Sequence, residues 1–492
     1  MAINGNRELY RVSNSEFLLQ LPPHVHGTPL TLDKRRVVAR SRKLFNLVKD
    51  QQNDLKQLPY TLPDIPGNLE TFELAMKFCY GYELSMTTEN VIPLICLAYY
   101  LEMTDEHSPD NLLNIAISFF NHNVLTVWHQ TLKALPTTEQ VNKQAMHLRI
   151  VDFCLDSLVR KARVNPFLIG EPIKSHIYNH GNDHNVDSGY NRASARRRLF
   201  LLDCQSDGIT MLSLQLYGLL MSKMILEGIR PDFIAASLFR YTKRWIHEDE
   251  EGSPSTHEEN YQREIIETVE KLLSIQIGVL PCKLLFEMLR TAMLLEASTQ
   301  CRYGFENRIG RQLIEATVED LLIPFQGYAC EVQYDTECVK RILKAFYSNY
   351  TSSDQSGLIK VADLIDDFLA VVAKEFDMNK DTFMSLLKLS AAASNDLHRT
   401  SDGMYHAIDV YLNKHKYNLT ESEREEVCQL LDCNRMSSKA CTHAAQNERL
   451  PLRVVVQTLF VGQLQLRDAI TSRIGDSENR VPKGGDGVGW RW

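Results

Sequence analysis

The sequence predicts a small α+β domain at the N-terminus followed by a large all-α domain, so that the protein is predominantly helical overall. Segments in which polar and apolar residues alternate, as in strands, occur only near the start of the chain. Apolar residues spaced three and four apart, as in amphipathic helices, then recur as far as Leu466. With 492 residues, 44% of them hydrophobic, the chain is long enough for several domains with buried cores.

The N-terminal domain is expected to span residues 8–107. YRVSNSEFLLQL alternates as a β-hairpin does, and RRVVARSRKLFNLVKD follows as a helix. LPYTLPDIPG is expected to form a short strand closed by a proline–glycine turn. Thr88 is predicted to cap a later helix. The helix between that turn and Thr88 is marked by an apolar stripe that ends before Gly81: Phe72, Ala75, Met76 and Cys79.

Four further regions follow along the chain. Residues 108–164 are predicted to form amphipathic helices that stack on the first domain. Residues 165–198 are rich in Gly, Asn, Asp, His and Arg without apolar periodicity, which indicates a linker. The all-helical domain is expected over residues 199–466, with an acidic loop at 247–260. Residues 467–492 include a glycine-rich end and are predicted to be a flexible tail.

The end of the helical domain carries clear helix start signals. Thr420 and Glu423 have the spacing of a capping box. Ser437 or Ser438 is expected to cap the next helix, and Pro451 suits the first turn of the last one, where a missing N–H costs nothing. One apolar stripe predicts the packing face of that last helix: Leu452, Val455, Val456, Leu459 and Phe460.

These segments also carry a resemblance. DGMYHAIDVYL, EREEVCQLLDC and ACTHAAQNERLPLRVVVQTLF resemble the signature of the plant non-phototropic-hypocotyl-three family, which couples an N-terminal BTB/POZ domain to a long helical domain. LPDIPG, FELAMKFCYG and AYYLEMTDE resemble that BTB/POZ domain closely from Leu62 to Glu106. The match before Leu62 is weak, and Leu32-Asp33-Lys34 stands where family members usually have a His-Lys pair. The resemblance therefore implies a BTB/POZ domain with a divergent N-terminal half.

The resemblance implies two functions. In the first, the chain is a substrate-specific adaptor of a cullin-3-based ubiquitin ligase in plant signalling. The BTB/POZ domain and residues 108–164 would contact cullin-3, and the helical domain would hold the target protein. In the second, it is a signalling scaffold that binds a photoreceptor kinase or auxin-transport regulators without cullin. Homo- or heterodimerisation through the BTB/POZ domain is implied in both cases.

Bulk properties narrow the classes of function. The net charge of −8 gives no general attraction to nucleic acid. The N-terminus lacks the apolar run of a signal peptide, and no apolar stretch has the length of a membrane span. The eleven cysteines are scattered singly, as expected of reduced thiols. We expect a cytoplasmic protein, or one at the periphery of the plasma membrane.

No motif predicts catalysis or a cofactor. The sequence lacks a G-x-S-x-G elbow, a P-loop and a G-x-G-x-x-G loop, so we expect no catalytic residues. Cys428, Cys433, Cys441 and His443 are close in sequence, which raises the question of zinc. Structural zinc ligands usually come in pairs two to four residues apart, and this spacing does not fit, so core thiols without a metal are the favoured interpretation.

Two sets of polar residues remain as candidate sites. The first set is a candidate partner-binding groove: Tyr405, His443, Gln446, Asn447 and Arg449. The alternative is that these residues cap helices and satisfy buried carbonyl groups. The second is Ser194, a candidate phosphorylation site among arginines in the predicted linker, for which the alternative is a solvated basic patch.

Overall fold

The computed structural model divides into two compact units. The N-terminal unit contains Met1–Pro254 and Lys271–Ser274, and the C-terminal unit contains Ser255–Glu270 and Ile275–Trp492. The structure describes residues 16–22, 29–50, 60–173, 208–246, 256–324, 334–351, 355–374, 378–394 and 399–478.

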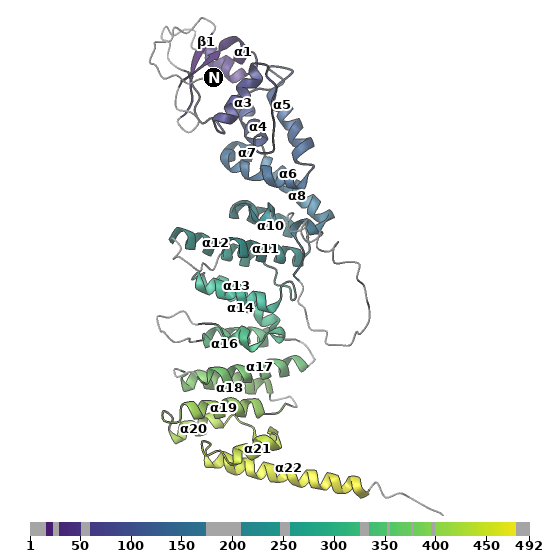
Figure 1. Cartoon of the computed structure of the whole chain (residues 1–492), viewed down its shortest axis with the longest axis vertical. Coiled ribbons are helices and arrows are strands. Elements are labelled where there is room, and N and C mark those ends of the chain that lie inside the picture. The colour runs from purple at the N-terminus through teal and green to yellow at the C-terminus, as the bar shows by residue number, and fades with distance from the viewer. Residues whose placement is uncertain are drawn as a thin grey trace, which may run out of the picture. The chain divides into compact units, whose positions relative to one another are not determined.

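A three-stranded sheet opens the N-terminal unit (Figure 1). The central strand β1 (Glu16–Gln20) pairs with β2 (Pro29–Asp33) in antiparallel register and with β3 (Tyr60–Thr61) in parallel register. Phe17 and Leu19, two residues apart on β1, are both buried, because alternate side chains of a strand share one face. The predicted short strand is confirmed. A β-hairpin is also present, formed by β1 and β2, whereas residues 10–15 of the segment predicted as a hairpin lie outside the described residues.

The predicted single helix after the hairpin is instead two, α1 (Lys34–Val38) and α2 (Arg42–Asp50). The break falls at Ser41, whose buried hydroxyl donates to the Leu101 carbonyl at 2.6 Å and accepts from the Leu44 N–H at 3.2 Å. The second bond satisfies one of the orphan donors at the start of α2. A tertiary contact that helical periodicity does not reveal therefore sets this boundary.

Helix α3 (Leu69–Cys79) buries the predicted stripe of Phe72, Ala75, Met76 and Cys79. It ends before Gly81, where the backbone has φ of 81°. The predicted cap at Thr88 is wrong. The next helix, α4 (Val91–Tyr100), begins three residues later, and the Asn90 side chain accepts from the Thr87 N–H at 2.8 Å. Every residue of α4 from Val91 to Ala98 is buried, so this helix is central to the unit.

Among its described residues, the N-terminal unit also contains helices α5 (Leu112–Phe119), α6 (Trp128–Ala134), α7 (Asn142–His147), α8 (Ile150–Val164), α10 (Leu214–Leu226) and α11 (Pro231–Trp245). Helix α10 packs on α8, with ion pairs from Lys223 to Asp156 at 2.5 Å and from Arg163 to Glu227 at 3.2 Å. The two units thus divide near residue 254, and α10 and α11 group with the preceding helices, although the helical domain was expected to start at residue 199.

The predicted linker 165–198 is described only in part. Its first residues form a helical turn, Pro166–Ile169, with Ile169 buried. Residues 174–207, and Ser194 with them, lie outside the described residues. The acidic loop predicted at 247–260 also needs a correction, because α12 (Thr256–Leu272) begins within it and residues 256–260 are helical. Residues 247–255 are not described.

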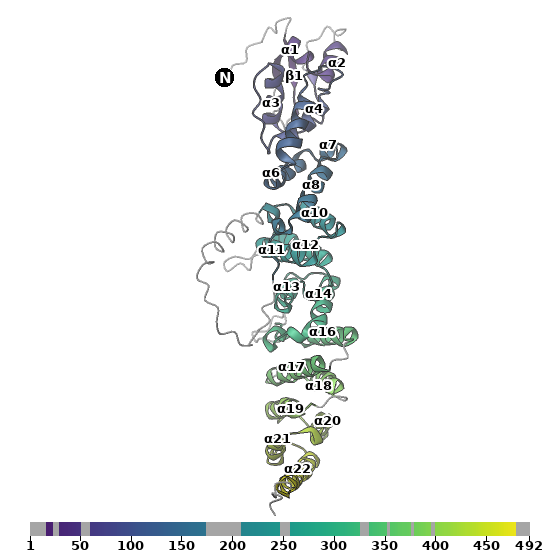
Figure 2. The ribbon, with the colours of Figure 1, turned by 90° about the vertical axis from the view of Figure 1, so that its right-hand side faces the viewer.

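Among its described residues the C-terminal unit is built of helices, apart from one isolated bridge between Pro324 and Tyr334 (Figures 1 and 2). Helices close in sequence pack on one another: α13 on α14, α14 on α16, α17 on both α18 and α19, and α21 on α22. The helices after α12 are α13 (Cys282–Leu294), α14 (Thr299–Arg311), α15 (Val318–Leu321), α16 (Thr336–Asn349), α17 (Ser356–Val372), α18 (Lys380–Ser394), α19 (Asp402–Lys414), α20 (Glu421–Cys428), α21 (Ser438–Ala445) and α22 (Leu452–Glu478).

Ion pairs to buried carboxylates and one close approach between helices fix the arrangement of this unit. The Glu306 carboxylate of α14 accepts from Arg341 of α16 at 2.8 Å, and Arg399 binds Asp366 of α17 at 2.5 Å. At Gly310 of α14, an added Cβ would lie 2.8 Å from the Cβ of Ala345. Removing the arginine of either pair would leave a buried carboxylate without its partner, so these contacts hold the helices in one arrangement.

The end of the chain differs from its predicted form. Helix α22 continues to Glu478, well into the segment 467–492 that was predicted to be a flexible tail. Residues 479–492 lie outside the described part of the chain. Among the described residues, no helix combines the length and the apolar character needed to cross a bilayer.

Candidate partner-binding site

The four last helices form the platform for the candidate site, and their start signals are mostly as predicted. Thr420 and Glu423 form the capping box of α20, and the Ser437 hydroxyl caps α21 by accepting from the Ala440 N–H at 3.2 Å. Pro451 precedes the first residue of α22, and its carbonyl accepts from the Val454 N–H at 2.9 Å. These caps satisfy N–H groups that a helix start leaves unpaired.

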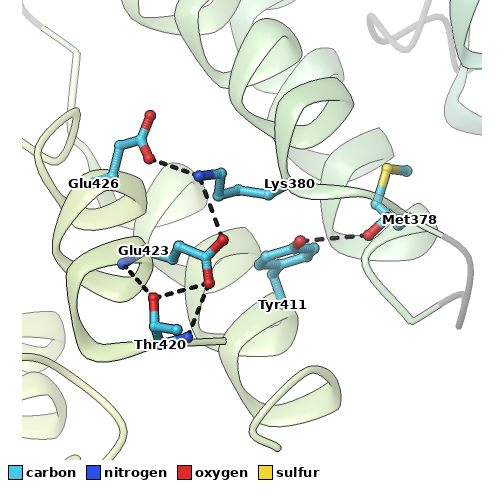
Figure 3. Close-up of polar contacts among 6 residues, drawn as sticks. All are labelled: Met378, Lys380, Tyr411, Thr420, Glu423 and Glu426. Atoms are coloured by element: carbon cyan, nitrogen blue, oxygen red, sulfur yellow. Dashed lines mark hydrogen bonds and ion pairs between the residues drawn. The ribbon is translucent and has the colours of Figure 1, made fainter. Parts of the chain in front are cut away.

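Side chains of α18 and α19 hold this platform in place (Figure 3). Lys380 of α18 contacts Glu423 at 3.5 Å and Glu426 at 2.8 Å, which ties α18 to α20. The Tyr411 hydroxyl of α19 donates to the Met378 carbonyl at 3.3 Å. The Tyr411 ring also stacks on Phe383 of α18, with ring centroids 4.0 Å apart. Helices α18, α19 and α20 are therefore joined by both polar and aromatic contacts.

The structure brings together four of the five candidate residues. The Tyr405 hydroxyl lies 2.6 Å from His443 Nδ1 and accepts from Asn447 Nδ2 at 3.2 Å. The Asn447 side-chain oxygen accepts from the Arg449 backbone N–H at 3.1 Å. Gln446 is exposed and lines a pocket beside these residues. Tyr405 of α19, His443 of α21 and two residues of the loop after α21, about forty positions from Tyr405, thus form one network.

Asp409 completes the network, and sequence reasoning missed it. It accepts from Asn447 Nδ2 at 2.7 Å and from Arg449 Nε at 2.9 Å. The available signal was its position four residues after Tyr405, which places both side chains on one face of α19. A carboxylate on that face is a natural partner for the cationic Arg449.

Burial raises the pKa of the Tyr405 phenol above its ordinary value, and the Asp409 carboxylate adds to this rise while the Asn447 hydrogen bond opposes it. The hydroxyl therefore stays protonated in the physiological range. Its oxygen accepts from Asn447 and also lies within hydrogen-bond distance of His443 Nδ1, so the phenol links the end of α21 to the segment that follows it.

A pocket of about 590 Å³ lies beside this network. It is lined by Leu412, Asn413, Lys416, Arg424, His443, Gln446, Asn447, Glu448 and Arg449. Three of these side chains are cationic and only Glu448 is anionic. Its outer part consists of exposed polar groups, including Lys416, His443 and Gln446. Such a lining favours an acidic group of a bound segment, and it contains no arrangement of nucleophile, base and orienting group.

The cysteines behave as core residues. Nine of the eleven lie in the described residues, and all nine are buried. Burial raises the pKa of the Cys428 thiol to about 12 and also raises the pKa values of Cys433 and Cys441, which disfavours the thiolates that metals bind. Within the described ranges, no three His, Cys, Asp or Glu side chains are placed to hold a metal ion together.

The predicted packing face of α22 is wrong. The residues buried along this helix are Val454, Thr458 and Val461, whereas Leu452, Val456, Leu459 and Phe460 of the predicted stripe are exposed. Val455 is half-buried. Two apolar faces compete on this helix, and α21 and the turn before it cover the one with the smaller side chains.

The fold is that of a predominantly helical protein with a small N-terminal sheet, and a polar pocket lies near its C-terminal end. Comparisons with known proteins identify a matching family and several similar proteins. Residues 203–441 match the model of the NPH3 family. The BTB/POZ domain-containing protein At5g17580 of Arabidopsis thaliana is 36% identical over 95% of this chain and 83% of its own length.

Two further Arabidopsis proteins extend this similarity. The BTB/POZ domain-containing protein At1g30440 is 38% identical over 93% of this chain and 73% of its own length. The BTB/POZ domain-containing protein At5g03250 is 37% identical over 93% of this chain and 81% of its own length. The chain belongs to the NPH3 family, which confirms the resemblance seen in its sequence. No solved structure matches it.

Proposed function

We propose that this protein is a substrate-specific adaptor of a cullin-3-based ubiquitin ligase in plant signalling. The observation that carries the proposal is that relatives named as BTB/POZ domain-containing proteins match almost the whole chain, including its N-terminal unit. The family and the names of these relatives suggest an adaptor or scaffold rather than an enzyme. An adaptor needs two binding surfaces and no chemistry of its own.

The N-terminal unit supplies the ligase contact in this proposal. A BTB/POZ domain formed by the sheet and helices α1 to α4, together with helices α5 to α8, would bind cullin-3. Self-association through the same domain would present two such contacts. Tethering raises the effective concentration of the target near the ligase, which is the whole of the adaptor's contribution.

The pocket beside Tyr405 supplies the target contact. Its cationic rim of Lys416 and Arg424 favours a target segment that carries acidic side chains, and the exposed His443 and Gln446 add further hydrogen-bonding groups. The network of Tyr405, Asn447 and Asp409 keeps the pocket wall in one conformation, which lowers the entropy lost on binding.

Proximity labelling in plant cells tests both contacts with the full chain. We expect the wild type to label cullin-3 and a set of target proteins. Lys416→Glu reverses a charge at the pocket rim, so it should reduce labelling of the targets at least several-fold and leave cullin-3 labelled. Lys439→Glu is the matched control, because Lys439 is an exposed lysine of α21 outside the pocket lining.

The outcome decides between the two roles. Equal target labelling by both charge-reversal variants would contradict the pocket as the target site. Labelling of signalling partners without cullin-3, by a chain that still self-associates, would instead favour the scaffold role with a photoreceptor kinase or transport regulator as partner.

A further inference from the structure

The pocket beside Tyr405 contains two guanidinium groups that the protein already holds in place. Arg449 binds the Asp409 carboxylate through Nε at 2.9 Å and through Nη2 at 2.7 Å. Arg424 donates from Nη2 to the Lys416 carbonyl at 3.0 Å. Both side chains line the pocket and are partly exposed, Arg449 at 33% and Arg424 at 26%. Each is therefore oriented before a ligand arrives, which lowers the cost of binding an anion.

The charges around this pocket nearly balance. Its lining supplies three positive charges and one negative charge: Lys416, Arg424, Arg449 and Glu448. The Asp409 carboxylate, bound to Arg449, compensates a second positive charge. Glu421 lies 3.7 Å from Arg424 but is 65% exposed, so solvent screens most of its effect. Leaving His443 aside, one positive charge remains uncompensated.

A remainder of one positive charge matches a single carboxylate. A phosphorylated side chain brings nearly two negative charges, and an acidic stretch brings several. Glu448 lines the pocket and would repel the charges beyond the first. The electrostatics therefore favour a partner that presents one carboxylate at a time.

The amide side chains of the pocket indicate where that carboxylate comes from. Asn413 and Gln446 are exposed and line the pocket together with the cationic groups. A side-chain amide both donates and accepts, so it can pair with a peptide group. At the end of a chain the last peptide group is only one Cα away from the carboxylate, whereas the carboxylate of an aspartate or glutamate is farther from its own peptide groups. A cavity of about 590 Å³ is large enough to take both groups.

We propose that this pocket binds the free C-terminus of a target protein. Lys416 and Arg424 bind the terminal carboxylate, and Asn413 and Gln446 bind the last peptide group, as in other sites that capture chain ends. The inference rests on the proposed function, in which the pocket is the target site, and it adds which part of the target enters.

Two libraries of short random peptides test the proposal. They are identical except that one ends in a free carboxylate and the other in a carboxamide, and each is passed over the immobilised full-length chain. Mass spectrometry of the retained peptides should show several-fold more free acid than amide. Lys416→Glu should abolish this preference. Lys439→Glu, the exposed lysine outside the pocket lining, is the matched control and should keep it.

Removal of the opposing charge should strengthen binding. Glu448→Gln leaves two uncompensated positive charges, so it should retain more free-acid peptides than the wild type and also admit phosphorylated ones. Glu425→Gln changes an exposed glutamate outside this lining and should behave as the wild type. Lys416 and Glu448 are both exposed, so thermal unfolding of their variants should be unchanged.

The possible outcomes separate this inference from the function on which it rests. Equal retention of acids and amides, retention of neither, or preference of the wild type for phosphorylated peptides would overturn capture of the C-terminus. If Lys416→Glu still reduced target labelling in cells, the pocket would remain the target site for an internal acidic group. Unchanged target labelling would instead contradict the proposed target site itself.

Discussion

At the scale of single residues, the candidate site contains buried side chains with structural contacts and exposed side chains for which we propose a binding role. Tyr405 and Asn447 satisfy each other, as expected of residues that stabilise helix junctions. His443 and Gln446 turn exposed groups toward the pocket. The two interpretations of these residues are therefore compatible. Buried members fix the pocket wall, and exposed members are available to a partner.

Substitution of two tyrosines on α19 distinguishes a structural role from a binding role. Tyr405→Phe removes the hydroxyl between His443 and Asn447, and Tyr411→Phe removes the donor to the Met378 carbonyl. Each loses hydrogen bonding worth about 1 kcal/mol, so denaturant unfolding should show similar destabilisation of both variants. Only Tyr405→Phe should weaken target labelling. Equal target labelling by the two variants would assign Tyr405 a purely structural role.

Glu423 makes part of the stability pH-dependent. Its hydrogen bonds to the backbone and side chain of Thr420, with a smaller effect of Lys380, hold its pKa below the ordinary value. A lowered folded-state pKa stabilises the fold above the unfolded-state pKa of about 4.3, and this stabilisation is lost as pH falls through the lower value. We expect wild type to exceed Glu423→Gln in unfolding free energy at neutral pH, with the difference vanishing in acid.

The control for this experiment lies two residues away. Glu425→Gln removes the same charge from the same helix outside the capping box. The difference in unfolding free energy between wild type and Glu425→Gln should therefore change less across the acidic range than the difference between wild type and Glu423→Gln. Parallel behaviour of the two variants would mean that the cap does not cause the effect.

At the scale of elements, local sequence signals predicted most helices. They failed where tertiary contacts determine a helix boundary or its buried face. The capping box at Thr420 and the stripe of α3 depend on neighbouring residues only, so they could be predicted from the sequence. The break at Ser41 depends on a contact with Leu101, sixty residues away. The buried face of α22 could not be chosen because both of its faces carry apolar residues. Asp409 was missed since its partners, Asn447 and Arg449, lie in the loop after α21, far away in the sequence.

Two glycines of the C-terminal unit test the packing of its helices. An added Cβ at Gly310 would lie 2.8 Å from Ala345 Cβ and 2.9 Å from the Ile342 carbonyl oxygen. At Gly462 the nearest atom would be Cys441 Cβ at 3.7 Å, an ordinary contact. Gly310→Ala should therefore destabilise the protein by about 1–3 kcal/mol. Gly462→Ala should stabilise it by about 0.5–1 kcal/mol, because alanine restricts the unfolded chain.

Urea unfolding of both alanine variants measures this difference. The same substitution in two helices of one unit should change stability in opposite directions. Destabilisation by Gly462→Ala, or no effect of Gly310→Ala, would show that the contact between α14 and α16 is looser than the structure indicates.

At the scale of the whole molecule, the sequence was sufficient to predict a small sheet at the N-terminus and helices beyond it, because residue periodicity reports element type directly. Division into units was harder, since α10 and α11 group with the preceding helices through contacts such as that of Lys223 with Asp156. For the candidate site, the sequence indicated the five polar residues but not Asp409, whose contacts with Asn447 and Arg449 are visible only in the fold.

We propose that this chain connects a ligase to a target by binding alone. The most direct measurement is the affinity of the purified full-length chain for purified cullin-3, with a cullin of another class as control. We predict saturable binding to cullin-3, little binding to the other cullin, and an unchanged affinity for Lys416→Glu. Absence of cullin-3 binding by a folded, self-associating chain would contradict the adaptor function.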